Sequence, residues 1–340
     1  MAQQPPPRAE PTKISVEAGL SGPHLDAFIR ATSNVLATKI AEETYAQIVD
    51  GLPLADVVRD TANVGLVPSN HPILDHKALC PGVMDKLREI RQTMDLGSLQ
   101  LEADLVGAYR ACSPGSRAFK TRLIEMTAVA VHAIAVHLFK LGTSLHTDDG
   151  IASWTPPNEE DSRYWSKNPD GALPTLFYHH WYSNHEQYPD GIADMVGYWA
   201  EARILGGVVL FDRRDPESSP KVQPDSVWLH GNRYNVTYRI YRLLDEQKQS
   251  LLAFLTSETP DLGVLPILGD EKNTTREDPE EPVENTGIYR NPWERKPRPE
   301  DQGFDSRLRT CWDQFDYPTQ ADKDRAYTRA KGWEWDSSSE

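Results

Sequence analysis

The amino-acid sequence predicts a mainly α protein: a helical bundle with a small β element and a long extended C-terminal strap. Three observations predict this class. Apolar residues recur at the helical period in most segments before residue 256. Two short β-like runs, 208–211 and 227–230, are separated by a turn-rich connector. Beyond residue 255 the chain is rich in proline and acidic residues and has little apolar periodicity.

The predicted helices follow one another and end at helix-breaking residues. The first spans 24–49, and Gly51 supplies its C-terminal stop. The longest spans about 117–141 and ends at Gly142. The others are expected at 54–63, 81–94, 99–112, 191–205 and 243–255, with a loop-rich passage over 143–190.

The charge distribution divides the chain into three parts. The net charge is −15, and the tail 256–340 has 12 basic and 20 acidic side chains, so 12 − 20 = −8. We expect a flexible N-terminus at 1–20, one helical-bundle domain at 21–255, and an acidic, Pro/Trp-rich strap at 256–340 packed on the bundle. Aromatic rings would pin this strap to the bundle; they are Trp293, Phe304, Trp312, Phe315, Tyr317, Trp333 and Trp335.

The composition disfavours several functional classes. An acidic surface repels phosphates, so we expect no nucleic-acid partner and no membrane partner. The three cysteines are too scattered for a disulfide framework or a cysteine zinc site. The longest apolar stretch, 127–139, is shorter than the roughly 20 residues of a membrane span, and the start of the chain lacks a signal pattern. We therefore expect a soluble, cytoplasmic protein, and no oligomeric state follows from the sequence.

The apolar segment 122–142 contains the first candidate site residues. Glu125 and His132 are seven residues apart, and seven residues turn a helix through about 700°, so both lie on one face. His137 points elsewhere. A buried carboxylate needs a partner or a proton. The pair is either a functional site or two satisfied core residues.

A second helix supplies a counterpart. Asp194 and Glu201 are also seven residues apart, with Tyr198 between them on nearly the same face. Helical bundles build metal sites from inward carboxylates and imidazoles of facing helices. The alternative is that both acids are solvated and the apolar side of this helix packs inward.

Histidines and aromatic residues also gather in the loop 178–185. Its histidines are His179, His180 and His185, and they either complete a zinc-like site or belong to an aromatic plug of the bundle. His146 lies near Asp148 and Asp149, a cluster that a turn with capping aspartates explains. The chain has no nucleophile elbow and no HExxH zinc motif.

Three segments carry a resemblance to a known family. They are RLIEMTAVAVHAIAVHLF, YHHWYSNHEQYPDGIAD and VGYWAEARILGGVVLFDRRDP. With the Pro/Trp-rich tail, the chain resembles the fungal hemocyanin-like enzymes of natural-product biosynthesis, the cyclopenases or viridicatin synthases. The resemblance covers about two thirds of the chain.

The resemblance implies a hemocyanin-core-like bundle, one bound Zn2+ and a quinolone alkaloid pathway. The reaction it implies is a lyase-type ring contraction. A cyclopenin-type epoxide with fused six- and seven-membered rings would become a viridicatin-type quinolone with two fused six-membered rings, losing methyl isocyanate. Oxygen carriage is not expected, because a dicopper site needs His-x-x-x-His pairs, whereas His71/His76, His132/His137 and His180/His185 are each five apart.

Transferred to these residues, the resemblance gives a mechanistic hypothesis. Zinc would be held by His132 with carboxylates from Glu125, Asp194 and Glu201, and would polarise a substrate oxygen. The candidate acid–base or orienting groups are Tyr198, His137, His179 and Arg203. The aromatic residues expected to stack on a small-molecule alkaloid substrate are Trp154, Tyr178, Trp181, Tyr198 and Trp199.

Two other functional classes remain open. A non-catalytic helical scaffold or interaction protein would use the same buried polar residues only to fix its packing. A pocket open to solvent and lined by Glu125 and His132 would favour an enzyme over this scaffold. A di-iron oxygenase is disfavoured because Glu-x-x-His pairs are absent.

Overall fold

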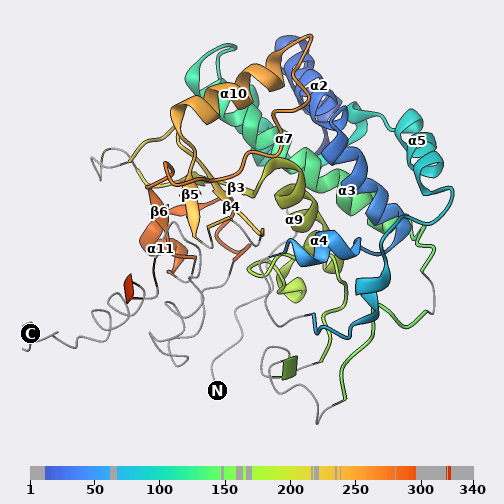
Figure 1. Cartoon of the computed structure of the whole chain (residues 1–340). Helices are drawn as coiled ribbons and strands as arrows, with labels where there is room; N and C mark the ends of the chain where they lie inside the picture. Colours follow the sequence, from blue (N-terminus) through green and yellow to red (C-terminus); the bar gives the residue numbers. More distant parts are fainter. Residues whose placement is uncertain are drawn as a thin grey trace, which may run out of the picture.

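A computed structural model describes most of the chain (Figure 1). The described residues are 12–61, 67–146, 149–157, 164–165, 171–215, 217, 222–233, 236–237, 239–279, 281–295, 319 and 321–322.

The helix α7 (Arg117–Lys140) forms the centre of the helical part. It packs against α9 (Ile192–Leu205), α2 (Gly22–Leu36) and α3 (Lys39–Asp50). The remaining helices are α1 (Val16–Gly19), α4 (Ala55–Arg59), α5 (Val83–Thr93), α6 (Ala103–Arg110), α10 (Asp245–Thr256) and α11 (Val283–Thr286). Three short 3-10 helices are η1 (Pro72–Asp75), η2 (Leu96–Ser98) and η3 (His185–Gln187).

A five-stranded antiparallel sheet lies beside these helices, in the order β6-β5-β4-β3-β7. Its central strands β3 (Val208–Asp212) and β4 (Val227–His230) are buried along their whole length. The flanking strands are β5 (Ile240–Arg242), β6 (Arg276–Glu277) and β7 (Ile288–Tyr289). A separate two-stranded sheet pairs β1 (Lys13–Ser15) with β2 (Gln100–Glu102).

Successive side chains of β3 point to opposite faces of the sheet, and each face packs against a different hydrophobic cluster. Val209 and Phe211 belong to the main core with α2, α3 and α7. Val208 and Leu210 face a second cluster, in which the aromatic rings of the 178–188 segment and of α9 gather. Because both faces of the sheet are covered, β3 and β4 read as continuous apolar runs in the sequence.

The prediction of a mainly α bundle is wrong. The described residues contain ten α-helices, 47% helix, together with the five-stranded sheet and the small sheet, which makes the fold mixed α/β. Three of the five strands are only two or three residues long. Such strands have no readable alternation, and they exist only because partners distant in sequence pair with them.

Segments from the early and late parts of the chain also form strands whose partners are distant in the sequence. Lys13–Gly19, expected in a flexible N-terminus, forms β1 and α1, and Val16 is fully buried. After residue 255, β6 and β7 extend the sheet at its two edges. Trp293 packs against the second cluster, whereas Phe304, Trp312, Phe315, Tyr317, Trp333 and Trp335 lie outside the described residues.

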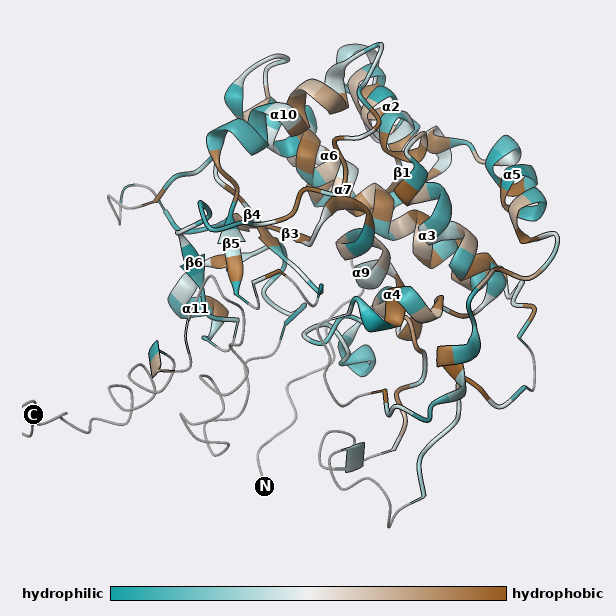
Figure 2. Ribbon diagram, in the orientation of Figure 1, coloured by the Kyte–Doolittle hydropathy of each residue, from teal (hydrophilic) through white to brown (hydrophobic). Residues whose placement is uncertain are grey.

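The composition of α7 is explained by its position. By length and apolarity this helix could cross a membrane, but 72% of its most apolar window is buried inside the protein. In Figure 2, hydrophobic residues concentrate where α7 meets its neighbours, whereas the peripheral α5 is largely hydrophilic. The burial of α7 in the core accounts for its sequence.

We predict that Asn34→Ala destabilises the fold. The Asn34 side-chain amide donates to the carbonyls of Phe254 at 2.8 Å and Ser257 at 2.9 Å, at the C-terminal end of α10. Removing the donor leaves these carbonyls without their partner, at a cost of about 1–3 kcal/mol in the free energy of unfolding. Urea denaturation measures this, and the exposed Asn285→Ala is the control, expected within about 0.5 kcal/mol of wild type. Equal stability of both variants would contradict the prediction.

Candidate functional site

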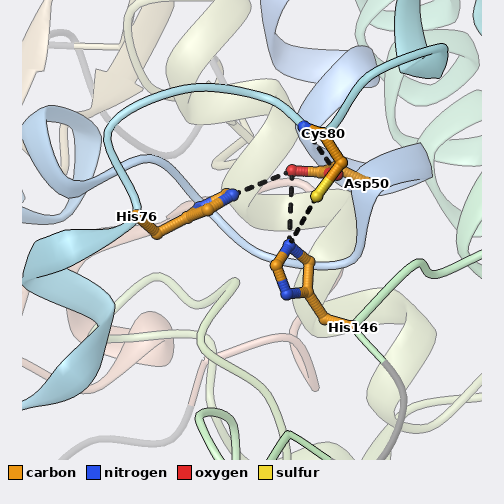
Figure 3. Close-up of side chains that lie close together, drawn as sticks. All are labelled: Asp50, His76, Cys80 and His146. Carbon is orange, nitrogen blue, oxygen red and sulfur yellow. Dashed lines mark hydrogen bonds and ion pairs between the residues drawn. The ribbon is translucent and has the colours of Figure 1, made fainter.

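Four side chains that commonly bind metals converge at one end of the helical body (Figure 3). They belong to Asp50, His76, Cys80 and His146, and one ligand atom from each lies within 4.8 Å of the others. Asp50 is fully buried and the other three are half-buried.

The local folding of three segments brings these residues together. Asp50 is the last residue of α3, and Gly51 ends the helix in the left-handed conformation with φ 108°. A side chain at position 51 would overlap Ser144, so glycine also allows the loop after α7 to approach. The Leu145 amide then donates to the Asp50 carbonyl at 2.8 Å, which places His146 beside Asp50. His76 and Cys80 lie in the loop between η1 and α5.

Both histidines are oriented so that Nε2 faces the centre. Nδ1 of His76 lies 3.0 Å from the Pro53 carbonyl, and Nδ1 of His146 lies 2.7 Å from Oδ2 of Asp149. A carbonyl and a carboxylate only accept, so Nδ1 carries the proton in each ring and Nε2 of the neutral ring has a free lone pair. Carboxylate or carbonyl partners of this kind are typical behind metal-binding histidines.

Two acceptor atoms face each other in this group when the His76 ring is neutral. Nε2 of His76 is 3.0 Å from Oδ2 of Asp50, and neither buried atom has a hydrogen-bond partner among the described residues. Nε2 of His146 is 3.4 Å from Sγ of Cys80 and 3.6 Å from Oδ2 of Asp50. Facing lone pairs repel unless a cation or an extra proton lies between them. The group could therefore hold a metal ion.

A bound cation would also change the state of Cys80. Without one, burial and the Asp50 carboxylate raise the pKa of the Cys80 thiol. Metal ligation requires the thiolate, so binding at this centre must release a proton and must weaken as the pH falls.

A pocket of about 540 Å³ lies along α7 and contains none of these four residues. Its apolar lining residues include Leu99, Leu101 and Val129, and the segment around η2 and β2 also contributes polar side chains such as Asp95 and Gln100. The lining residues from α7, α9 and the segment after β7 include Glu125, His132, Asp194, Tyr198, Arg290 and Glu294. The first four of these were predicted from the sequence.

The pocket floor is a buried chain of charges around His132. Its Nε2 is 2.9 Å from Oδ1 of Asp194, and its Nδ1 is 3.7 Å from Oε2 of Glu201. Burial alone would lower the pKa of His132, but the hydrogen bond to Asp194 and the nearby Glu201 carboxylate outweigh it, and the pKa is raised. The imidazole thus favours its protonated form. A Cβ at Gly197 would lie 2.4 Å from Nε2, so glycine is needed for α9 to pack against this ring.

Arg290 completes the chain from the far end of the sequence. Its Nη1 lies 2.9 and 3.0 Å from the two carboxylate oxygens of Glu201, and its Nε donates to Glu294 at 3.0 Å. The Arg290 charge and the bond to His132 offset the burial of Glu201, whose pKa is lowered. The five side chains of this chain, which are those of His132, Asp194, Glu201, Arg290 and Glu294, are therefore paired with one another out of water.

Glu125 lies apart from this chain. It accepts from Arg122 and Arg213, each at 2.5 Å, and it lines the pocket without contacting His132. The expected ligand set of three carboxylates and one histidine is thus divided: His132, Asp194 and Glu201 meet, whereas arginines neutralise Glu125.

Tyr198 and His137 are the other predicted residues that line the pocket. His137 is exposed at its rim. His179 lies in the second cluster, where burial lowers its pKa to about 4 and keeps it neutral. Arg203 binds Asp60 at 2.6 Å.

The aromatic residues expected to stack on a substrate, apart from Tyr198, lie outside the pocket. Trp154 lies beside His71, Trp199 lies beside Phe177, and Tyr178 and Trp181 belong to the second cluster.

Sequence reasoning missed the four-residue group and Arg290. The available signal was HKALC, in which His76 and Cys80 are four residues apart. Their partners Asp50 and His146 are 26 and 66 residues away, and Arg290 is 89 residues from Glu201. No local pattern links such distant positions.

Comparison with protein-family models, with curated proteins and with solved structures finds no match for this chain. The resemblance to the hemocyanin-like enzymes therefore remains a prediction.

We predict that Cys80→Ser removes a thiolate ligand from the four-residue centre. Wild type titrated with Co2+ should show a thiolate-to-cobalt charge-transfer band that C80S lacks, with metal affinity falling as the pH is lowered. Cys112→Ser is the matched control, because Cys112 bonds a carbonyl within α6. A band that survives in C80S, or that is lost equally in C112S, would exclude the centre.

We also predict how the contribution of His132 to the free energy of unfolding depends on pH. Because its pKa is raised above 6.5 in the folded protein, this contribution is complete below about pH 6.5 and is lost as the pH rises through the folded-state pKa. The difference in unfolding free energy between wild type and His132→Gln, measured by urea denaturation, should shrink from pH 6.5 upward. A difference that grows over this range would contradict the assignment.

Proposed function

We propose that this protein is an enzyme that performs acid–base chemistry on a small organic molecule in the pocket along α7. The observation that supports this most is the buried imidazole of His132 beside the pocket, with Nε2 2.9 Å from Asp194 and Nδ1 3.7 Å from Glu201, two carboxylates that favour its protonated form. In this role His132 is a general acid that delivers a proton to an oxygen of the substrate. Asp194 orients the ring and stabilises its charge.

The shape of the pocket favours a largely apolar substrate with one polar end. A volume of about 540 Å³ suits a bicyclic or tricyclic organic molecule. Several of the acids that line the pocket are paired with cations, as in Asp190 with Lys13 and Lys140 and Glu125 with Arg122 and Arg213, which favours an uncharged ligand.

The finer proposal rests on the sequence resemblance. It is the ring contraction of a cyclopenin-type bicyclic epoxide to a viridicatin-type quinolone with loss of methyl isocyanate, in fungal alkaloid biosynthesis. Protonation of the epoxide oxygen by His132 would assist ring opening, and the neutral imidazole would later take a proton back.

We propose Zn2+ as the ion at the four-residue centre. Two imidazoles, one thiolate and one carboxylate suit zinc, and four protein ligands fill its tetrahedral shell. Such a closed site favours a structural role, so zinc would fasten the ends of α3 and α7 to the loop before α5. This differs from zinc as a Lewis acid at His132, which the sequence analysis considered. A reduced Cys80 is consistent with a cytoplasmic protein.

The non-catalytic scaffold is the competing proposal. Its supporting observation is that the charges around His132 are mutually satisfied, as in a purely structural network. The pocket beside these charges favours the enzyme, because a scaffold does not require a cavity at its buried histidine.

We predict that His132→Gln abolishes turnover. Incubation of wild type with cyclopenin should yield viridicatin and methyl isocyanate in mass spectrometry, and H132Q should be slower by about 10²–10⁴-fold, the usual contribution of a general acid. His24→Gln is the control, because His24 bonds the Cys112 carbonyl in the helical body and does not line the pocket. Metal analysis of the same wild-type sample should find one equivalent of zinc.

Three results would contradict these proposals separately. Absence of turnover by wild type would overturn the cyclopenin reaction. Turnover by H132Q at the wild-type rate would overturn the role of His132. Absence of zinc would overturn the identity of the metal.

A further inference from the structure

Tyr198 is held rigidly at the pocket floor. Its ring stands edge-on to His132, with ring centres 4.5 Å apart, and stacks on Tyr182 at 4.6 Å. The guanidinium of Arg290 lies 5.6 Å from the ring centre. With neighbours on three sides and only 1% exposure, the ring has one orientation.

The hydroxyl of Tyr198 differs from those of five other buried tyrosines. The hydroxyls of Tyr45, Tyr109, Tyr188 and Tyr241 each donate to a backbone carbonyl, and that of Tyr182 lies 3.3 Å from Nδ1 of His230. No hydrogen bond of the Tyr198 hydroxyl is found in the described part of the chain, and this oxygen is not one of the fully buried side-chain atoms that lack a partner. Because Tyr198 lines the pocket, its hydroxyl is open to a partner that enters the pocket.

The surrounding groups determine what this partner is. Burial raises the pKa of Tyr198 well above 10, so the hydroxyl keeps its proton. The cations beside it are already engaged: His132 with Asp194, and Arg290 with Glu201 and Glu294. The carboxylates of this wall are abundant acceptors. The hydroxyl therefore adds the hydrogen-bond donor that the wall otherwise lacks.

We propose that Tyr198 is the ligand-binding donor of the pocket, and that the ligand is an uncharged ring compound whose carbonyl or ether oxygen accepts this hydrogen bond. The apolar residues Leu99, Leu101 and Val129, which also line the pocket, would contact the remainder of the ring system. The proposal rests on the pocket's being a ligand site. It does not depend on which reaction follows.

Two probes of equal shape test the proposal. Dihydroquinolinone carries a carbonyl, and tetrahydroquinoline has the same fused rings without it. By isothermal titration calorimetry, Tyr198→Phe should weaken dihydroquinolinone binding about tenfold and tetrahydroquinoline binding less than about twofold. The melting temperature of Y198F should equal or exceed that of wild type, because the lost hydroxyl had no protein partner.

Tyr241→Phe is the matched control. Its hydroxyl donates to the Ile267 carbonyl at 3.3 Å, away from the pocket, so Y241F should melt at a lower temperature and bind both probes as wild type does. Equal weakening of both probes by Y198F, no weakening, or no binding of either probe to wild type would overturn the proposal. Because cyclopenin turnover is measured separately, its absence would overturn the proposed reaction and leave the binding result standing.

Discussion

The pairing of charges that are removed from water is the constraint on which this structure depends. His132 on α7, Asp194 and Glu201 on α9, and Arg290 after β7 form one continuous chain. Each of these ions would be costly to bury alone, and removing one partner leaves another uncompensated. The two central helices and the segment after β7 must therefore adopt their positions together. Gly197 permits this by leaving room for the imidazole against α9.

The position of the pocket follows from this chain. The charges join α9 and the 290–294 segment to α7, and residues around η2 and β2 also line the cavity. Charged and apolar side chains thus line one cavity. Because the ions are paired with one another, the Tyr198 hydroxyl is the group left for a ligand, and the proposed proton delivery starts from a His132 imidazole already bound to Asp194. This arrangement suits proton delivery to an oxygen of an otherwise apolar molecule.

The four-residue group lies beyond the end of α7, whereas the pocket lies along the helix. The pocket extends along the helix from Glu125 to Lys140, whereas the centre uses His146 in the loop that follows. That loop is fastened to the end of α3 by the Leu145–Asp50 hydrogen bond. A metal ion there would link three segments with little regular structure of their own. Leu141 and Leu145 beside it are exposed, so hydrophobic packing is sparse there. A metal ion would therefore add stability where the core adds little.

Features that depend on local periodicity could be predicted from the amino-acid sequence. These are the long buried helix at 117–141, the helix at 191–205, the two central strands, and the polar residues Glu125, His132, Asp194, Tyr198 and Glu201 within apolar helices. Long-range contacts instead set the mixed α/β class, the separation of Glu125 from His132, the Arg290 partner and the group Asp50, His76, Cys80 and His146. Helical periodicity acts over a few residues, whereas strand pairing, charge pairing and the convergence of possible metal ligands join positions tens of residues apart.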